Sequence, residues 1–189
     1  GGSLLTCVSA HEYYVAVGSS KGAILLFDKD NNFLTDLSPK ISDVIAAKSG
    51  GSVNQNTKII NEIAAVTCLS FSRDGSSLIA GHADGAVVLW DCKNFTMLLY
   101  SSQVHPVPQK LQNESNSTHN AKQSILSLSF WAQTKHHAIS ANAAGNVQIL
   151  QYSQFLSMGL RLDCQPLLDS SPRIGSIIRV LPLPSPQLY

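Results

Sequence analysis

The clearest pattern in the chain is a set of three short apolar segments within residues 65–91, separated by Asp-Gly pairs. In the first segment Leu69, Ser70 and Phe71 alternate strictly, which places the two large side chains on one face of a strand. In the last, residues 86–90 are continuously apolar, as in a strand that is buried on both faces. Asp-Gly pairs reverse the chain because glycine tolerates a positive φ. The pattern predicts three consecutive antiparallel strands, and so one blade of a β-propeller.

The same order of strand, strand, turn and strand recurs on both sides of this segment. Its turn glycines are Gly22, Gly85 and Gly145, which are 63 and 60 residues apart. Propeller repeats are usually about 40 to 45 residues long, so extra residues lie between them, in two polar stretches rich in Ser, Asn, Gln and Lys. The expected organisation is a blade at 4–37, an insert at 38–61, a blade at 62–101, an insert at 102–123, a blade at 124–168 and the start of another blade at 173–189.

The predicted fold class is therefore all-β: a partial β-propeller of about three blades and the first strand of a fourth, in one domain over residues 1–189. Closed propellers have roughly four to eight blades of four strands each. Three blades and a fragment cannot close a ring, so we expect the chain to be part of a longer protein. The polar inserts are expected to project from the blades and to offer surface to partners.

Composition adds little to this interpretation but narrows the class of protein. The chain has 189 residues, of which 44% are hydrophobic, and a formal net charge of +1. It contains no run of about 18 apolar residues and no secretion signal, which predicts a cytoplasmic protein. Cys7 and Cys68 hold the same position in the first strands of successive blades and are expected to be small buried apolar residues rather than half of a disulfide framework.

Candidate chemistry is weak throughout the chain. Residues 18–22 lack the Gly-Lys-Ser/Thr ending of a phosphate loop, and no histidine has a zinc-finger spacing to cysteine. Basic residues are scattered among acids, so no nucleic-acid surface is predicted. We expect no catalytic, cofactor-binding or metal-binding residue and no cofactor. The residues that matter are expected to be structural ones in the turns and strands: Gly22, Asp84, Gly85, Trp90, Asp91 and Gly145.

Several short motifs together resemble one family. The third strand of the central blade ends in Trp90-Asp91, the dipeptide for which WD repeats are named. The other matching pieces are Val15–Gly18, Leu25–Asp28, Cys68–Phe71, Leu78–Gly81, His105-Pro106, Met158-Gly159 and Cys164. In this order they resemble the amino-terminal WD-repeat propeller of the vacuolar protein sorting-associated protein 8 family, whose members are subunits of the endosomal CORVET tethering complex.

The resemblance implies a non-catalytic protein-interaction propeller that acts in endosome and vacuole protein transport. Its implied partners are other class C vacuolar sorting subunits and an early-endosomal Rab GTPase, with membrane association only through them and a peripheral location on endosomes. The alternative is a WD-repeat scaffold of another pathway, such as a ubiquitin-ligase receptor or a coat subunit. An enzyme is not expected, because the predicted innermost strands are small and apolar.

The resemblance has departures. WD repeats often carry a hydrogen-bonded tetrad made of a Gly-His dipeptide ahead of the blade, a turn Asp, a Ser or Thr, and the Trp. Only Asp84 and Trp90 match these positions, since His82 lies at the end of the second strand. Phe27 and Leu150 replace the tryptophan in the flanking blades, which predicts that apolar packing alone holds those blades.

Overall fold

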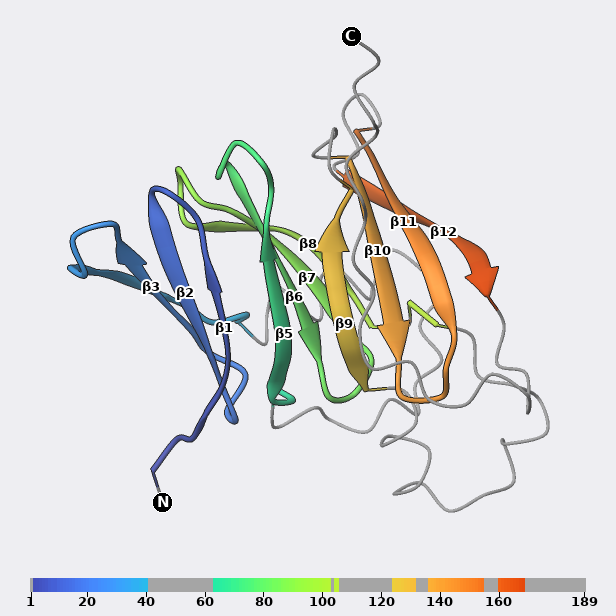
Figure 1. Cartoon of the computed structure of the whole chain (residues 1–189), viewed down its shortest axis with the longest axis horizontal. Helices are drawn as coiled ribbons and strands as arrows, with labels where there is room; N and C mark the ends of the chain where they lie inside the picture. Colours follow the sequence, from blue (N-terminus) through green and yellow to red (C-terminus); the bar gives the residue numbers. More distant parts are fainter. Residues whose placement is uncertain are drawn as a thin grey trace, which may run out of the picture.

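The computed structural model describes residues 2–40, 63–102, 104–105, 124–131, 136–154 and 160–168. Within these residues the regular structure is β-strand, arranged as three four-stranded antiparallel sheets. The strands of each sheet pair in the order in which they follow along the chain. Figure 1 shows the three sheets as a row of upright blades. The predicted all-β partial propeller is confirmed, while the predicted start of a fourth blade at 173–189 lies outside the described residues.

The bounds of the strands define the three blades. Blade 1 contains β1 (Leu5–Ala10), β2 (Tyr14–Ser19), β3 (Ile24–Asp28) and β4 (Phe33–Leu37). Blade 2 contains β5 (Val66–Phe71), β6 (Ser77–His82), β7 (Val87–Asp91) and β8 (Thr96–Ser101). Blade 3 contains β9 (Ile125–Phe130), β10 (His137–Asn142), β11 (Val147–Gln154) and β12 (Leu160–Leu168).

The second and third strands of all three blades are joined by the same turn. Its glycine has a positive φ in each blade, 79° at Gly22, 87° at Gly85 and 86° at Gly145. The amide of each glycine donates to the carbonyl oxygen three residues earlier, at 3.2, 3.1 and 3.0 Å. Residues other than glycine rarely adopt this left-handed backbone conformation. The recurrence of glycine in the sequence therefore has a direct conformational cause.

Two apolar cores lie between the blades. The core between blades 1 and 2 is made by Ala16, Ile24, Leu26, Leu37, Val66, Leu69, Leu78, Ala80, Val88, Trp90 and Cys92. The core between blades 2 and 3 is made by Ile79, Val87, Leu89, Val104, Ile125, Leu128, Phe130, Ala138, Leu150 and Tyr152. Burial of each large apolar side chain is worth about 1.5 to 3 kcal/mol, so the faces of the sheets hold the row together.

Strand β7 explains why the apolar run in the middle of the chain is continuous. Val88 and Trp90 belong to the core shared with blade 1, while Val87 and Leu89 belong to the core shared with blade 3. Successive side chains of a strand point to opposite faces, and here both faces are covered. A strand that is polar on alternate positions could not occupy this place.

The blades approach each other most closely at their first two strands. Val66, the first residue of β5, packs on Gly18 of blade 1, where a β-carbon would lie 2.8 Å from its Cγ1 atom. Ile125, the first residue of β9, packs in the same way on Gly81, where a β-carbon would lie 2.7 Å from its Cγ2 atom. The glycine is thus required by space, and the same contact is repeated at both interfaces.

Candidate functional site

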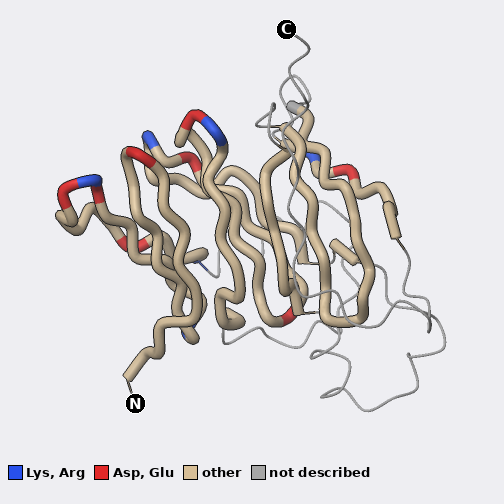
Figure 2. Tube along the Cα trace, viewed as in Figure 1, with Lys and Arg blue, Asp and Glu red and all other residues tan. Residues whose placement is uncertain are grey.

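One end of the blades combines charged loop residues with exposed aromatic side chains. We call it the loop end; it consists of the loops β1–β2, β3–β4, β5–β6 and β7–β8 and of Trp131 after β9. Figure 2 shows charged residues gathered there. In blades 1 and 2 these are Glu12, Asp28, Lys29, Asp30, Arg73, Asp74, Asp91 and Lys93. Acids outnumber bases among them, so this surface carries mixed charge with a negative balance.

An aromatic cluster ties the loops of blades 1 and 2 together at this end. The His11 ring lies 5.9 Å from the Phe71 ring, and Tyr14 stacks on Phe71 at 6.2 Å. The His11 Nε2 atom donates to the Arg73 carbonyl oxygen at 3.0 Å, because a carbonyl can only accept. A β-carbon on Gly75 would lie 2.6 Å from the His11 ring. His11 therefore bridges two blades and fixes the position of both loops.

The β5–β6 loop is also held from within. Asp74 accepts hydrogen bonds from the Ser72 hydroxyl at 2.7 Å and from the Ser76 hydroxyl at 2.8 Å. Its Oδ1 atom also accepts from the Ser76 amide at 3.1 Å. The Asp-Gly pair that predicts this turn thus has two functions: the glycine supplies a φ of 66° and the aspartate closes the loop on itself.

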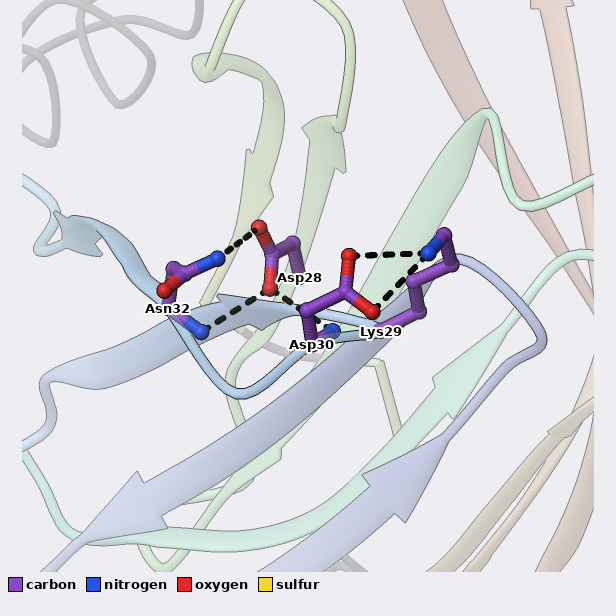
Figure 3. A network of polar contacts seen from close by, with 4 residues as sticks. All are labelled: Asp28, Lys29, Asp30 and Asn32. Atoms are coloured by element: carbon purple, nitrogen blue, oxygen red, sulfur yellow. Dashed lines mark hydrogen bonds and ion pairs between the residues drawn. The ribbon is translucent and has the colours of Figure 1, made fainter.

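Asp28 organises the β3–β4 loop, as Figure 3 shows. Its Oδ1 atom accepts from the amides of Asp30 and Asn32, at 2.8 and 2.9 Å, and its Oδ2 atom accepts from the Asn32 side-chain amide at 2.9 Å. Donation by the Asn32 side chain and by these amides lowers the pKa of Asp28. Lys29 and Asp30 form an exposed ion pair at 2.8 Å beside it.

Asp91 holds the same place in blade 2. It accepts from the amide of Lys93 at 2.7 Å and from the Asn94 side chain at 2.8 Å. Burial opposes its ionisation, but these donors outweigh burial and the pKa of Asp91 lies below its usual value. The aspartate that ends the third strand therefore closes the next turn in both blades, whether phenylalanine (blade 1) or tryptophan (blade 2) comes before it.

The polar tetrad of WD repeats is divided between two blades. In blade 2, Asp84 accepts from the nearby Ala86 amide at 3.1 Å, and the buried Trp90 Nε1 atom has no hydrogen-bond partner among the residues that the structure describes. His82 donates from Nδ1 to the Ala64 carbonyl oxygen at 2.8 Å, and burial lowers its pKa. The tetrad residues that the sequence does contain in this blade are therefore not joined to one another.

Blade 3 corrects the expectation that the flanking blades are held by apolar packing alone. His105, ahead of the blade, lies 2.8 Å from Ser140 of β10, from Nε2 to Oγ, and both side chains are buried. These are the histidine and serine positions of the tetrad, in a blade that has Leu150 in place of tryptophan. The histidine is visible in the sequence, but its partner is 35 residues away, beyond a polar insert. No local pattern connects the two residues, so the pair could not be predicted.

Nearly the whole sequence of the chain matches one family model. The Vps8 beta-propeller model matches residues 2–188 of the chain. The chain belongs to the Vps8 beta-propeller family. The match confirms the resemblance inferred from the short motifs. No curated protein sequence is significantly similar to the chain.

Solved propellers show the same fold at low sequence identity. The Vps8-family chain is similar to the Cps50 (Swd1) beta-propeller domain of Myceliophteria thermophila, with a TM-score of 0.57 and 13% identity, covering 88% of this chain and 41% of that one. It is similar to U3-55K, with a TM-score of 0.55, 12% identity and coverages of 87% and 40%. It is also similar to the WD40 repeats of RRP9, with a TM-score of 0.54, 12% identity and coverages of 87% and 39%. The chain spans about two-fifths of the length of these propellers.

The cysteines and the acidic and histidine side chains of this Vps8-family propeller are the groups that thiol chemistry and metal binding would require. All four cysteines are free, and burial raises the pKa of Cys68 and of Cys92 to about 12, so both remain unreactive thiols near neutral pH. Over the residues that the structure describes, no group of three His, Cys, Asp or Glu side chains could hold a metal ion. No helix among those residues is long and apolar enough to cross a membrane.

Proposed function

We propose that this chain is the protein-interaction propeller of an endosomal vesicle-tethering subunit, and that it contacts partners through its loop end. Membership of the Vps8 beta-propeller family supports the tethering assignment. The partners we propose are the other class C vacuolar sorting subunits and an early-endosomal Rab GTPase, which would bring the protein to the endosomal membrane. The observation that carries the choice of surface is the set of exposed aromatic side chains at this end, where hydrogen bonds hold the loops of blades 1 and 2.

Each of the three blades has an exposed aromatic side chain at the loop end. Tyr13 is 51% exposed, Phe95 40% and Trp131 41%. Tyrosine, tryptophan and arginine are enriched among the residues that contribute most to protein–protein binding. Arg73 lies in the neighbouring loop, where its carbonyl oxygen accepts a hydrogen bond from His11, and the His11 ring lies 5.3 Å from the Tyr13 ring. This composition fits a protein partner.

The rigidity of the loops favours the same proposal. Asp28, Asp74 and Asp91 each hold their own loop by several hydrogen bonds. A surface that is already ordered loses less conformational entropy when it binds. The excess of acids at the loop end would also repel a phosphate backbone, which supports a protein partner over a nucleic acid.

The first test is a pull-down with the double variant Tyr13→Ala and Trp131→Ala in the full-length protein. Loss of two exposed aromatic anchors is expected to reduce capture of class C subunits or of the GTPase by tenfold or more. The matched control is Leu98→Ala, which removes a 38% exposed apolar side chain from the middle of β8. Unchanged capture by the double variant, with circular dichroism also unchanged, would refute the loop end as the binding surface.

A second variant separates the loop end from the polar inserts. Deletion of residues 109–120, which lie outside the described residues, removes part of the insert at 102–123. Under the loop-end proposal this deletion leaves capture unchanged. Loss of capture on deletion, with no effect of the double variant, would assign binding to the insert instead.

The tethering assignment needs its own experiment. Affinity purification of the tagged full-length protein, followed by mass spectrometry, is expected to recover class C vacuolar sorting subunits. Recovery of ubiquitin-ligase or coat components in their place would support a scaffold of another pathway and would leave the propeller fold untouched.

A further inference from the structure

The loop between β7 and β8 contains a residue in an unfavourable backbone conformation. The described residues with a positive φ are Gly22, Gly75, Gly85, Gly145, Asn31 and Phe95. Glycine has no β-carbon to clash in this left-handed region, and asparagine is much more common there than most other residues. Phenylalanine has neither advantage, so a φ of 55° at Phe95 strains the backbone.

Packing in the core does not explain why phenylalanine occupies this position. Phe95 is 40% exposed and belongs to neither of the two apolar cores that join the described blades. Trp90, which comes earlier in the same hairpin, is 4% exposed and lies in the core against blade 1. The Phe95 ring thus stands outside the packed part of its hairpin, although the backbone is strained where it carries the ring.

Hydrogen bonds hold the loop in this conformation. The Asp91 carboxylate accepts from the amides of Lys93 and Asn94, at 2.7 and 3.3 Å, and from the Asn94 side chain at 2.8 Å. On the other side of Phe95, Thr96 is the partner of Asp91 in the strand register. Strain persists only where the surrounding structure fixes it, and here it is fixed on both sides. Phe95 is therefore held at one place on the loop end.

The corresponding loop of blade 1 shows that such a turn does not require an aromatic residue. Asp28 closes the β3–β4 loop as Asp91 closes the β7–β8 loop. The left-handed residue there is Asn31, with a φ of 64° and an exposed side chain. Asparagine thus suits the backbone in blade 1, whereas Phe95 in blade 2 strains the backbone and adds a ring that faces solvent.

We propose that Phe95 is an apolar anchor of the loop end and that a protein partner receives its ring in an apolar pocket. This role rests on the proposed function and specifies one contact of the same surface. The neighbours Lys93, Asn94 and Thr96 are polar and exposed, so the ring has a polar rim, as the central residues of protein interfaces do. An aromatic ring has only two χ angles and loses little conformational entropy when a pocket encloses it.

A membrane is a poorer partner for this ring. Exposed phenylalanine also enters the interface of lipid bilayers, but the cytoplasmic leaflet carries negative charge. In blades 1 and 2 the acids of the loop end outnumber its bases. Repulsion between the two surfaces therefore opposes insertion and favours a pocket in a protein.

The test measures binding of the full-length protein to purified class C subunits and, separately, to the purified GTPase. Phe95→Asn is expected to reduce binding to at least one of them tenfold or more. Because asparagine suits the left-handed backbone, the unfolding temperature should not fall by more than about 4 °C. The control Leu98→Asn introduces the same side chain at a 38% exposed position of β8 and should leave binding unchanged.

A second variant tests whether the partner needs an apolar side chain. Phe95→Leu keeps an apolar side chain and the unfavourable backbone conformation, so it is expected to bind better than Phe95→Asn and to unfold at a lower temperature. A purely structural role of the ring would instead put binding and stability in the same order. Equal binding by the two variants would refute the apolar pocket.

The other outcomes separate this anchor from the proposed function. Unchanged binding by Phe95→Asn, an equal loss for Leu98→Asn, or a larger fall in the unfolding temperature of Phe95→Asn would each overturn the anchor. If the double variant Tyr13→Ala and Trp131→Ala loses binding while Phe95→Asn does not, the anchor is refuted and the proposed function stands. Failure of the unaltered protein to bind either probe would refute both.

Flotation with vesicles of phosphatidylcholine and phosphatidylserine tests the membrane directly. The amount of full-length protein that floats with the vesicles is expected to be the same for the unaltered protein and for Phe95→Asn. A loss of flotation in Phe95→Asn would assign the ring to the lipid surface and overturn the proposal.

Discussion

At the scale of single residues, the distance between neighbouring blades depends on two glycines. A β-carbon on Gly18 would lie 2.8 Å from the Cγ1 atom of Val66 in blade 2, and one on Gly81 would lie 2.7 Å from the Cγ2 atom of Ile125 in blade 3. Contacts this short do not occur between real atoms of these kinds. Even one methyl group would therefore move a strand of the neighbouring blade.

We predict that Gly81→Ala lowers the free energy of unfolding by about 1 to 3 kcal/mol, the usual effect of overpacking a tight core. Urea denaturation of the protein and the variant measures the difference. Addition of Cys68→Ala should restore part of the loss, because it removes the sulfur that the new methyl group meets. Gly2→Ala is the control, since nothing lies within 4 Å of the β-carbon position there; equal effects of the two glycine substitutions would contradict the prediction.

His105 is a second residue whose environment has a measurable consequence. It is 3% exposed, and burial lowers its pKa to about 4, whereas an unfolded histidine titrates near about 6.5. As the pH falls below about 6.5, the unfolded chain takes up this proton first. Stability is therefore unaffected above that pH and is lost progressively down to about pH 4.

Between pH 7 and pH 5 the expected loss of stability from His105 is about 2 kcal/mol. Denaturation at the two pH values measures it, and His105→Gln serves as the reference because glutamine can still bond to Ser140 without titrating. The difference in unfolding free energy between the two pH values should be smaller in the variant by this amount. An equal loss in both proteins would show that His105 does not titrate in this range.

At the scale of elements, the turns are stabilised by different means at the two ends of a blade. The turns between second and third strands depend on a left-handed glycine, as at Gly85. The turns between third and fourth strands depend on an aspartate that accepts several hydrogen bonds, as at Asp28 and Asp91. The aspartate of the Trp-Asp dipeptide thus has a local function that does not require the tryptophan.

We predict that Asp91→Ala lowers the free energy of unfolding by about 1 kcal/mol, because the amides of Lys93 and Asn94 lose their acceptor. The control is Lys93→Ala, which keeps the amide and the carboxylate and should have no measurable effect. Since the pKa of Asp91 is lowered in the folded protein, its contribution is present above about pH 4 and disappears as the pH falls through the folded-state value. Thermal unfolding at pH 7 and at pH 2.5 checks both statements.

Local patterns in the sequence were sufficient to predict the first three strands of each blade, but they did not locate the fourth strands β4, β8 and β12. Asp-Gly and x-Gly pairs between apolar runs located the turns at Gly22, Gly85 and Gly145, because each signal involves only a few adjacent residues. Contacts between blades were harder to predict. The hydrogen bond of His105 with Ser140 and the bridge from His11 to Arg73 join residues 35 and 62 positions apart. No short-range pattern in the chain specifies such pairs.

At the scale of the whole molecule, the apolar faces of the sheets determine how the blades assemble. The continuous run in β7 predicted burial on both faces, and the structure gives a core on each side of it. The exposure of Leu5 could not be predicted from the sequence, because its apolar character is the same as that of Val66. Only the arrangement of the blades distinguishes a covered first strand from an uncovered one.

Every hydrogen-bonded strand pair in the three sheets joins strands that are consecutive along the chain. Each sheet can therefore form as soon as its own segment has left the ribosome, without waiting for residues still to be synthesised. The entropic cost of bringing two blades together grows only with the logarithm of the length of the linker between them. The segments between sheets can thus be lengthened or shortened at little expense to folding, which leaves them free to take on contacts that the sheets themselves do not need.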